Sequence, residues 1–369
     1  MNIKKQAISM AICASLAISA VPVQTEAAGI GDIVGIGVGI AQYAAQKEQM
    51  KKEIQFMNTT PQGQAQLLQY FQEKKGVSDN PTYTNKLDRI MTNLLKAVKE
   101  VDKDDKNSLP YRYFVAEDKS LNAACTMGHI MMVNTGTFDI LATEDEVAAV
   151  VGHELGHGQK NHVAKGIEKK MDNQILAQVG AAAAGSTTLA NIVGGIALTQ
   201  ANAHADKGHE WEADRMSFEY MTHTNYNPGA CAAVMQKFIE LLGTQKQSGV
   251  ELLLNPSDHP NSEARRDKML EFLHEYSGKN VSMKDATVKV NGKDFVTPAA
   301  AGGLSKAGRA CFVLGNLASA YKHGQGKAAA TVQNGTVMLG NQPILTPVSG
   351  DESAEVLAAR LNELRADKK

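Results

Sequence analysis

Residues 152–162 read GHELGHGQKNH, a stretch that places two histidines four positions apart with a glutamate beside the first. Upstream, Thr143 and Glu146 have the spacing of a capping box, in which two side chains close the first turn of a helix. One apolar face then continues through Val147, Val151 and Leu155. The sequence therefore predicts a helix that begins near Thr143 and carries the histidine-rich stretch in its later turns.

This predicted helix places His153 and His157 on one face, because residues four apart lie one above the other, so both imidazoles can bind one ion. Glu154 lies one step round the helix, where it can reach a metal-bound water without being a ligand. The arrangement is the H-E-x-x-H motif, in which zinc acidifies the water and the glutamate takes its proton. His162 falls off the shared face, and we interpret it as a solvated residue or as a support behind a ligand. The alternative for the whole stretch is a polar helix face that binds no metal.

A second group of acidic residues supplies the remaining ligand that such a site needs. A catalytic zinc usually has three protein ligands and one open position. In HEWEADRM, residues 209–216, Glu210 and Asp214 are four apart on another predicted helix. We expect Glu210 to be the third ligand and Asp214 to accept the N–H of a ligating histidine, which fixes the ring. Glu212 lies on another face and is the alternative third ligand. The prediction is one zinc per chain.

Three segments resemble the core of the HtpX, BepA and Oma-type zinc metallopeptidases, relatives of the Ste-type enzymes. They are residues 122–162, EWEAD at 210–214 and SDHPNSEARRDKM at 257–269. The resemblance covers about residues 60–275 and implies a mainly helical gluzincin fold with a small sheet, together with endopeptidase activity. Carried over residue by residue, it implies zinc ligands at His153, His157 and Glu210, a general base at Glu154 and a supporting carboxylate at Asp214.

The last of these segments adds His259 and Arg265 as candidate catalytic residues. In some relatives the histidine of this segment covers the metal and keeps the enzyme latent, so the resemblance implies a gate at His259. Two alternatives stay open. His259 donates to the oxyanion of the reaction, with Arg265 as the backup donor, or it is a loop histidine beside a proline.

Two runs with strand character precede the H-E-x-x-H helix. They are YRYFVAED, residues 111–118, and GHIMMVNTG, residues 128–136. The free edge of the second predicted strand offers backbone groups to which a peptide can bind as an added strand. The expected partners are therefore unfolded or misassembled protein substrates.

The first 28 residues have the three parts of a secretory signal peptide: Lys4 and Lys5, an apolar run, and small residues before a cleavage site. We predict an exported protein, periplasmic or secreted, with an uncleaved anchor as the alternative. Residues 175–199 are mostly Ala, Gly and short aliphatic residues. We interpret them as two short packed helices that touch a membrane surface or an envelope-protein partner, with a membrane span as the alternative. The 38 basic and 39 acidic residues nearly balance, which argues against a nucleic-acid partner.

The composition changes at about residue 279. Beyond it, residues 286–297 and 330–345 alternate around Asn-Gly dipeptides, which are typical of tight hairpins, and helical patterns cover 308–324 and 352–368. We predict a signal peptide at 1–28, a metalloprotease domain at 29–278, and a small C-terminal α+β domain at 279–369 with a binding or docking role.

These observations predict an α+β protein whose main domain is a zinc-dependent endopeptidase for quality control of exported proteins. The alternative is a chaperone-like binding or assembly protein that uses the same groove with little proteolysis. Glu154 favours the enzyme, because binding alone needs no general base.

Overall fold

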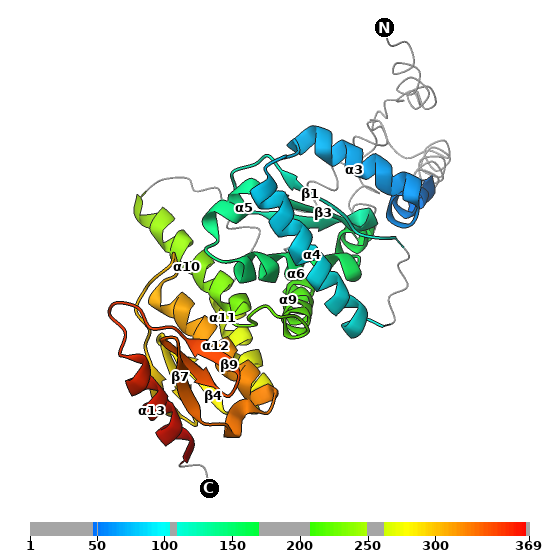
Figure 1. Ribbon diagram of the computed structural model, residues 1–369. Helices are drawn as coiled ribbons and strands as arrows, with labels where there is room; N and C mark the ends of the chain where they lie inside the picture. The colour runs from blue at the N-terminus through cyan, green and yellow to red at the C-terminus, as the bar shows by residue number, and fades with distance from the viewer. Residues whose placement is uncertain (1–46, 50, 104–108, 170–206, 249–261, 367–369) are drawn as a thin grey trace, which may run out of the picture.

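The computed structural model describes residues 47–49, 51–103, 109–169, 207–248 and 262–366. The predicted signal peptide, the stretch 175–199 and His259 lie outside the described residues. Figure 1 shows a larger, mainly helical part around one small sheet and a smaller C-terminal part with two further sheets, so the predicted α+β class is confirmed. Within the described ranges, no helix combines the length and apolar character needed to cross a bilayer.

The sheet of the larger part has three strands, β1 (Arg112–Ala116), β2 (Ala123–Thr126) and β3 (Ile130–Asn134), in the order β1-β3-β2. β3 runs parallel to β1 and antiparallel to β2, so it is paired on both sides. The prediction that the strand within residues 128–136 offers a free edge is therefore wrong. In the described part of the chain, β2 is the edge strand that packs against the H-E-x-x-H helix.

α6 (Glu144–Gln159) is the predicted helix, and its capping box is present. The Thr143 hydroxyl accepts the Glu146 N–H at 3.1 Å, and the Glu146 carboxylate accepts the Thr143 N–H at 2.9 Å. These two bonds satisfy backbone donors that a helix start otherwise leaves without partners. The capping box therefore fixes the start of α6 at Glu144.

α9 (Lys207–Thr222) lies against α6 because two glycines of α6 leave room for it. A Cβ atom on Gly156 would lie 3.0 Å from the Ala213 Cα, and one on Gly152 would lie 3.1 Å from the Ser217 Oγ. A methyl group at Gly156 would crowd the backbone of α9, and one at Gly152 would crowd the Ser217 side chain. The glycines on either side of His153 thus allow the close approach that brings Glu210 to the histidines.

The other helices of this part complete the core. They are α3 (Pro61–Lys75), α4 (Pro81–Val101), α5 (Thr135–Ile140), α10 (Ala230–Ser248) and α11 (Ser262–Tyr276). α4 starts with Pro81 at its first position, and the Asn80 side chain accepts the Thr82 N–H, which is a favoured helix start. Its buried face, Leu87, Ile90, Met91, Leu94, Ala97 and Val98, lies in the main apolar core.

The C-terminal part consists of two similar units, each a three-stranded meander followed by a helix. The first has β4 (Val281–Lys284), β5 (Thr287–Val290), β6 (Lys293–Val296) and α12 (Lys306–Lys322). The second has β7 (Ala330–Gln333), β8 (Thr336–Leu339), β9 (Gln342–Leu345) and α13 (Ala354–Ala366). Both predicted Asn-Gly hairpins are confirmed, with positive φ angles at Asn291 (51°) and Gly292 (80°), and at Asn334 (50°) and Gly335 (75°).

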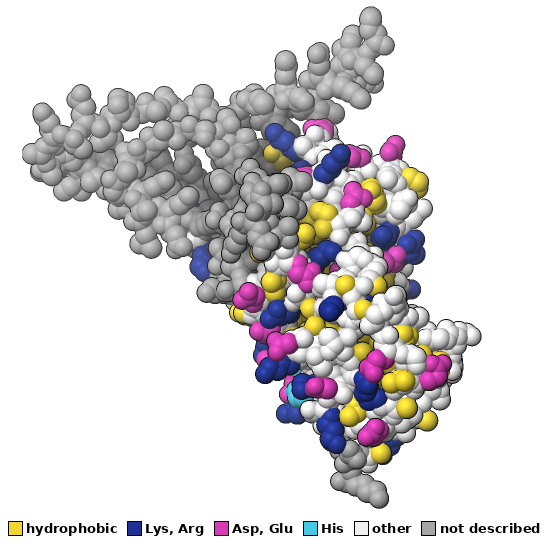
Figure 2. Space-filling model, turned by 90° about the vertical axis from the view of Figure 1, so that its left-hand side faces the viewer, with side chains coloured by type: hydrophobic (Ala, Val, Ile, Leu, Met, Phe, Trp, Pro, Cys, Tyr) yellow, Lys and Arg dark blue, Asp and Glu magenta, His cyan; other side chains and the backbone are white. Residues whose placement is uncertain are grey.

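The C-terminal part shares its core with the larger part. α12 packs on α10 and α11, and one cluster of buried apolar side chains continues across both parts. Asn227 adds a polar link: its backbone N–H donates to Asp145 at 2.8 Å, and its side-chain amide donates to the Phe312 carbonyl at 3.0 Å. In Figure 2 basic and acidic side chains are interspersed over the face in view, so neither sign dominates there.

Candidate metal centre

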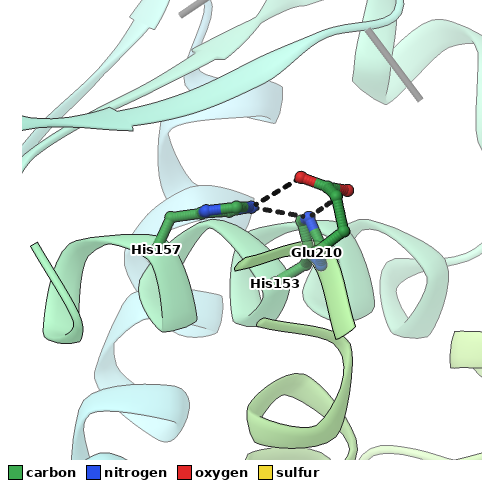
Figure 3. A group of neighbouring side chains, drawn as sticks. All are labelled: His153, His157 and Glu210. Atoms are coloured by element: carbon green, nitrogen blue, oxygen red, sulfur yellow. Dashed lines mark hydrogen bonds and ion pairs between the residues drawn. The ribbon is translucent and has the colours of Figure 1, made fainter. Parts of the chain in front are cut away.

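Three buried side chains converge between α6 and α9. His153 and His157 lie one turn apart on α6, and their Nε2 atoms are 3.0 Å apart (Figure 3). Glu210 reaches them from α9, with Oε1 3.2 Å from the Nε2 atom of His157 and Oε2 3.6 Å from that of His153. The three residues offer ligand atoms that all lie within 4.8 Å of one another. The structure thus brings together the three residues that the sequence predicted as metal ligands.

His153 is supported from behind by a carboxylate. The Asp214 Oδ1 atom accepts from the His153 Nδ1 atom at 2.9 Å, as the spacing of the acidic pair predicted. Burial disfavours the charged carboxylate, but the Arg265 guanidinium and the His153 hydrogen bond outweigh it and lower the pKa of Asp214 to about 2. Asp214 is therefore an anion at neutral pH and holds the N–H of His153 on the Nδ1 side.

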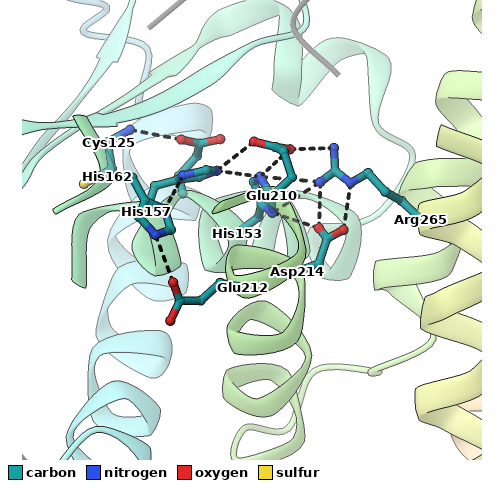
Figure 4. Close-up of polar contacts among 9 residues, drawn as sticks. Cys125, His153, His157, His162, Glu210, Glu212, Asp214 and Arg265 are labelled. Atoms are coloured by element: carbon teal, nitrogen blue, oxygen red, sulfur yellow. Dashed lines mark hydrogen bonds and ion pairs between the residues drawn. The ribbon is translucent and has the colours of Figure 1, made fainter. Parts of the chain in front are cut away.

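Arg265 is a buried residue of α11 that links two carboxylates of the centre (Figure 4). Its Nε and Nη2 atoms donate to Asp214 at 2.7 and 2.6 Å, and its Nη1 atom lies 3.0 Å from Glu210 Oε2. A guanidinium between two carboxylates fixes both, because its donors are arranged in a rigid plane. These contacts favour a positioning role over the predicted donation to an oxyanion, which stays a prediction.

His157 is supported by a second histidine. Its Nδ1 atom lies 2.9 Å from the Nδ1 atom of His162, whose Nε2 atom lies 3.1 Å from Glu212 Oε2. His162 is fully buried, so its interpretation as a solvated residue is wrong, and it occupies the predicted alternative place behind a ligand. Glu212 does not belong to the three-residue group, although it was the alternative ligand.

The end of α6 explains why helical spacing placed His162 on the wrong side. The helix ends at Gln159, and Asn161 takes a positive φ of 52°, which reverses the chain. His162 then begins a new helix over residues 162–169 and returns to His157. Asn is the residue after Gly that most readily ends a helix in this conformation, so Asn161 was the signal in the sequence.

Glu154 lies between α6 and the edge strand β2. Its Oε2 atom accepts the backbone N–H of Cys125 at 3.1 Å, and its side chain is buried on the helix that carries both histidines. The bond orients one carboxylate oxygen. It also shows that the N–H of Cys125 points away from β3, towards the outer edge of β2.

A small cavity of about 30 Å³ lies beside His153 and Glu154. Its apolar walls come from α6 (Ala149 and Val150), α10 (Val234, Met235 and Phe238) and α11 (Met269). Leu121 and Ala123 border it at the start of β2, so the cavity lies next to both the edge strand and the candidate ligands.

The donor set fits a zinc ion. Burial lowers the pKa of His157, so its ring is neutral, and each histidine has its Nδ1 atom engaged by a partner behind it. The two Nε2 atoms lie 3.0 Å apart beside the Glu210 carboxylate, so one metal ion could bind all three groups. Two imidazole nitrogens and one carboxylate oxygen are also the donor set of many catalytic zinc sites.

The fold and this centre together are those of a metallopeptidase with an H-E-x-x-H helix. Residues 81–272, more than half of the chain, match the profile of peptidase family M48, and the chain belongs to that family. It is 30% identical over 175 residues to the metalloprotease LoiP of Escherichia coli K12, a match that covers 44% of this chain and 64% of LoiP.

Two further relatives match a similar share of the chain. The beta-barrel assembly-enhancing protease of Escherichia coli K12 is 24% identical over 155 residues, which are 40% of this chain and 32% of the relative. The mitochondrial metalloendopeptidase OMA1 of Arabidopsis thaliana is 27% identical over 135 residues, which are 37% of this chain and 27% of the relative. The chain thus spans less than two thirds of the length of each of these relatives.

Proposed function

We propose that this protein is a zinc-dependent endopeptidase that cleaves unfolded or misassembled exported proteins. The observation that carries the proposal is the buried group of His153, His157 and Glu210, with Glu154 on the same helix and next to the edge strand. Family membership supports the reaction class. Export rests on the signal-peptide features of residues 1–28, and the name of the beta-barrel assembly-enhancing relative is in keeping with substrates of that kind.

His153, His157 and Glu210 would hold the zinc ion, which when bound would supply an acidified water and a positive charge for the scissile carbonyl. Glu154 accepts the proton of the water and returns it to the leaving amine. Asp214 and Arg265 hold His153 and Glu210 in place, so these ligands need no rearrangement during turnover. An intact general base at this place favours the peptidase over the chaperone-like alternative.

The edge strand and the cavity support an unfolded substrate. A peptide that pairs with the outer edge of β2 must be extended and must have unpaired backbone groups, which folded proteins seldom offer. The apolar walls of the cavity beside His153 favour an apolar side chain, and such side chains are mostly buried in folded proteins. We therefore expect cleavage next to apolar residues in extended segments.

The first prediction follows from this function. The purified chain is expected to contain one zinc ion, and to cleave casein and the reduced, alkylated form of a globular protein much faster than the folded form. Removal of zinc with 1,10-phenanthroline should abolish cleavage, and added zinc should restore it. The melting temperature should fall on removal, because a ligand at 100 times its Kd stabilises by about 2.7 kcal/mol. Cleavage that persists in the zinc-free protein would contradict the proposal.

His259 lies outside the described residues, and its role as a gate is proposed from the resemblance alone. If it covers the metal, His259→Ala should raise the rate on casein without changing the zinc content. If it donates to the oxyanion, the same substitution should lower the rate by roughly 10²-fold or more. Steady-state rates of the two proteins, with zinc measured in parallel, decide between these results, and a clear fall would refute the gate.

The predicted membrane-surface or envelope-protein partner concerns residues 175–199, which also lie outside the described residues. We keep it as a proposal, together with the docking role of the C-terminal part.

A further inference from the structure

The two histidine ligands are supported in different ways. Behind His153 lies a carboxylate, Asp214, which Arg265 fixes in turn. Behind His157 lies the ring of His162, and Glu212 follows at 3.1 Å. The second arrangement is a chain of two imidazoles and one carboxylate, which is longer than the usual single acceptor behind a ligand.

The hydrogen-bond directions in this chain follow from its two ends. The His162 ring is fully buried, with Nδ1 facing His157 and Nε2 facing the Glu212 carboxylate. A neutral imidazole has one N–H and one lone pair. Since the Glu212 carboxylate only accepts, the N–H of His162 is on Nε2 and its lone pair is on Nδ1.

The consequence for His157 is direct. Its Nδ1 atom faces the lone pair of His162 at 2.9 Å, so it must be the donor of that hydrogen bond. The lone pair of His157 is then on Nε2, the atom that faces His153 and Glu210. With the opposite protonation of His162, His157 would accept on Nδ1 and carry its N–H on Nε2, where that nitrogen could not bind a metal.

The local fold holds the chain of groups together. The turn that returns His162 to His157 is stabilised by Asn58, whose side chain donates to Asn161 at 3.0 Å. The His209 ring stacks on His162 with centroids 4.0 Å apart. Glu212 is two residues from Glu210 on α9, so one helix supplies a ligand and the acceptor that orients another ligand.

We propose that His162 and Glu212 are positioning residues that hold His157 in the tautomer that binds zinc. The proposal rests on the proposed zinc centre. Loss of a partner behind a ligand typically weakens metal binding by about 10- to 100-fold, and we expect an effect of this size.

The test compares two charge reversals on α9. Glu212→Lys replaces the acceptor by a donor and forces the opposite protonation of His162. Glu219→Lys is the matched control, because Glu219 is on the same helix in an exposed ion pair with Arg215, and its side chain is 41% exposed against 39% for Glu212. The zinc Kd is measured by competition with a chromophoric chelator, and the melting temperature of each zinc-free protein checks the fold.

We expect Glu212→Lys to weaken zinc binding by about 10- to 100-fold relative to Glu219→Lys, with zinc-free melting temperatures that agree. Equal zinc affinity in the two variants would overturn the positioning role. A wild-type protein that binds no zinc would overturn the zinc centre itself, and the positioning role with it.

A second pair of variants separates hydrogen bonding from packing. His162→Asn keeps an acceptor oxygen near the place of the imidazole Nδ1 atom, whereas His162→Leu has nearly the same shape and no acceptor. The asparagine variant is expected to bind zinc at least about 5-fold more tightly than the leucine variant. This difference is a part of the roughly 10- to 100-fold change in metal affinity that is typical when a partner behind a ligand is lost. Equal binding by the two would overturn the proposal, because packing alone would then explain the place of His162.

Discussion

Glu154→Gln is expected to lower the turnover of an unfolded substrate by roughly 10²–10⁴-fold while one zinc ion per chain is retained, because an amide cannot accept the proton of the attacking water. The fold should survive, since the glutamine carbonyl oxygen can still accept the Cys125 N–H that Glu154 accepts at 3.1 Å. The measurements are kcat/KM on a fluorogenic peptide with an apolar residue beside the scissile bond, and the zinc content of the same sample.

A control variant on the same helix makes the result specific. Glu144→Gln removes a carboxylate near the start of α6, where it pairs with Arg89 at 2.7 Å at the surface. An exposed pair of this kind contributes about 0–1 kcal/mol to stability, so the control should keep its rate and its zinc. Near-normal turnover by Glu154→Gln would show that another group accepts the proton.

The candidate site could be predicted largely because its central geometry is local. His153 and His157 share one face of a single helix, and the capping box at Thr143 shows where that helix begins. The convergence with Glu210 is not local. It depends on the close packing of two helices, and the sequence shows it only through the glycines of α6 and the resemblance of the acidic segment to a known family.

Strand order was the part of the fold that local patterns could not predict. The apolar run of β3 marks a strand but does not say on which sides it is paired. β2 has only four residues, AACT, and its two alanines have low strand propensity, so it was missed. β2 lies at the edge of the sheet because of long-range strand pairing. The surface that we propose for the substrate depends on the same pairing.

The sequence also did not predict how the C-terminal part packs against the larger part. Composition separated this part from the rest, and the Asn-Gly turns predicted its hairpins, but neither shows that α12 lies against α11. α11 carries Arg265, which touches both Asp214 and Glu210. The C-terminal part therefore supports the helix that holds the metal centre together, whatever else it binds.

Loss of either histidine ligand is expected to reduce zinc below one ion per chain. His153→Ala or His157→Ala removes one of three donors, so the affinity should fall by more than the roughly 10- to 100-fold typical of a partner behind a ligand. Proteolysis should fall with the zinc content, because both depend on the same centre. In His153→Ala the ion pair between Asp214 and Arg265 stays intact, so α11 should keep its place. A loss of zinc from this variant therefore reports the missing ligand.

His223→Ala is the matched control for these variants, because His223 is an exposed histidine just beyond the end of α9, where it contacts the Glu219 carbonyl. It should bind one zinc ion and cleave casein at the normal rate. Zinc is measured after dialysis against a weak chelator, and circular dichroism verifies the helix content of each variant. The double variant His153→Ala/His157→Ala gives the decisive result: one tightly held zinc per chain in that protein would mean that the ion binds elsewhere and that α6 carries no metal centre.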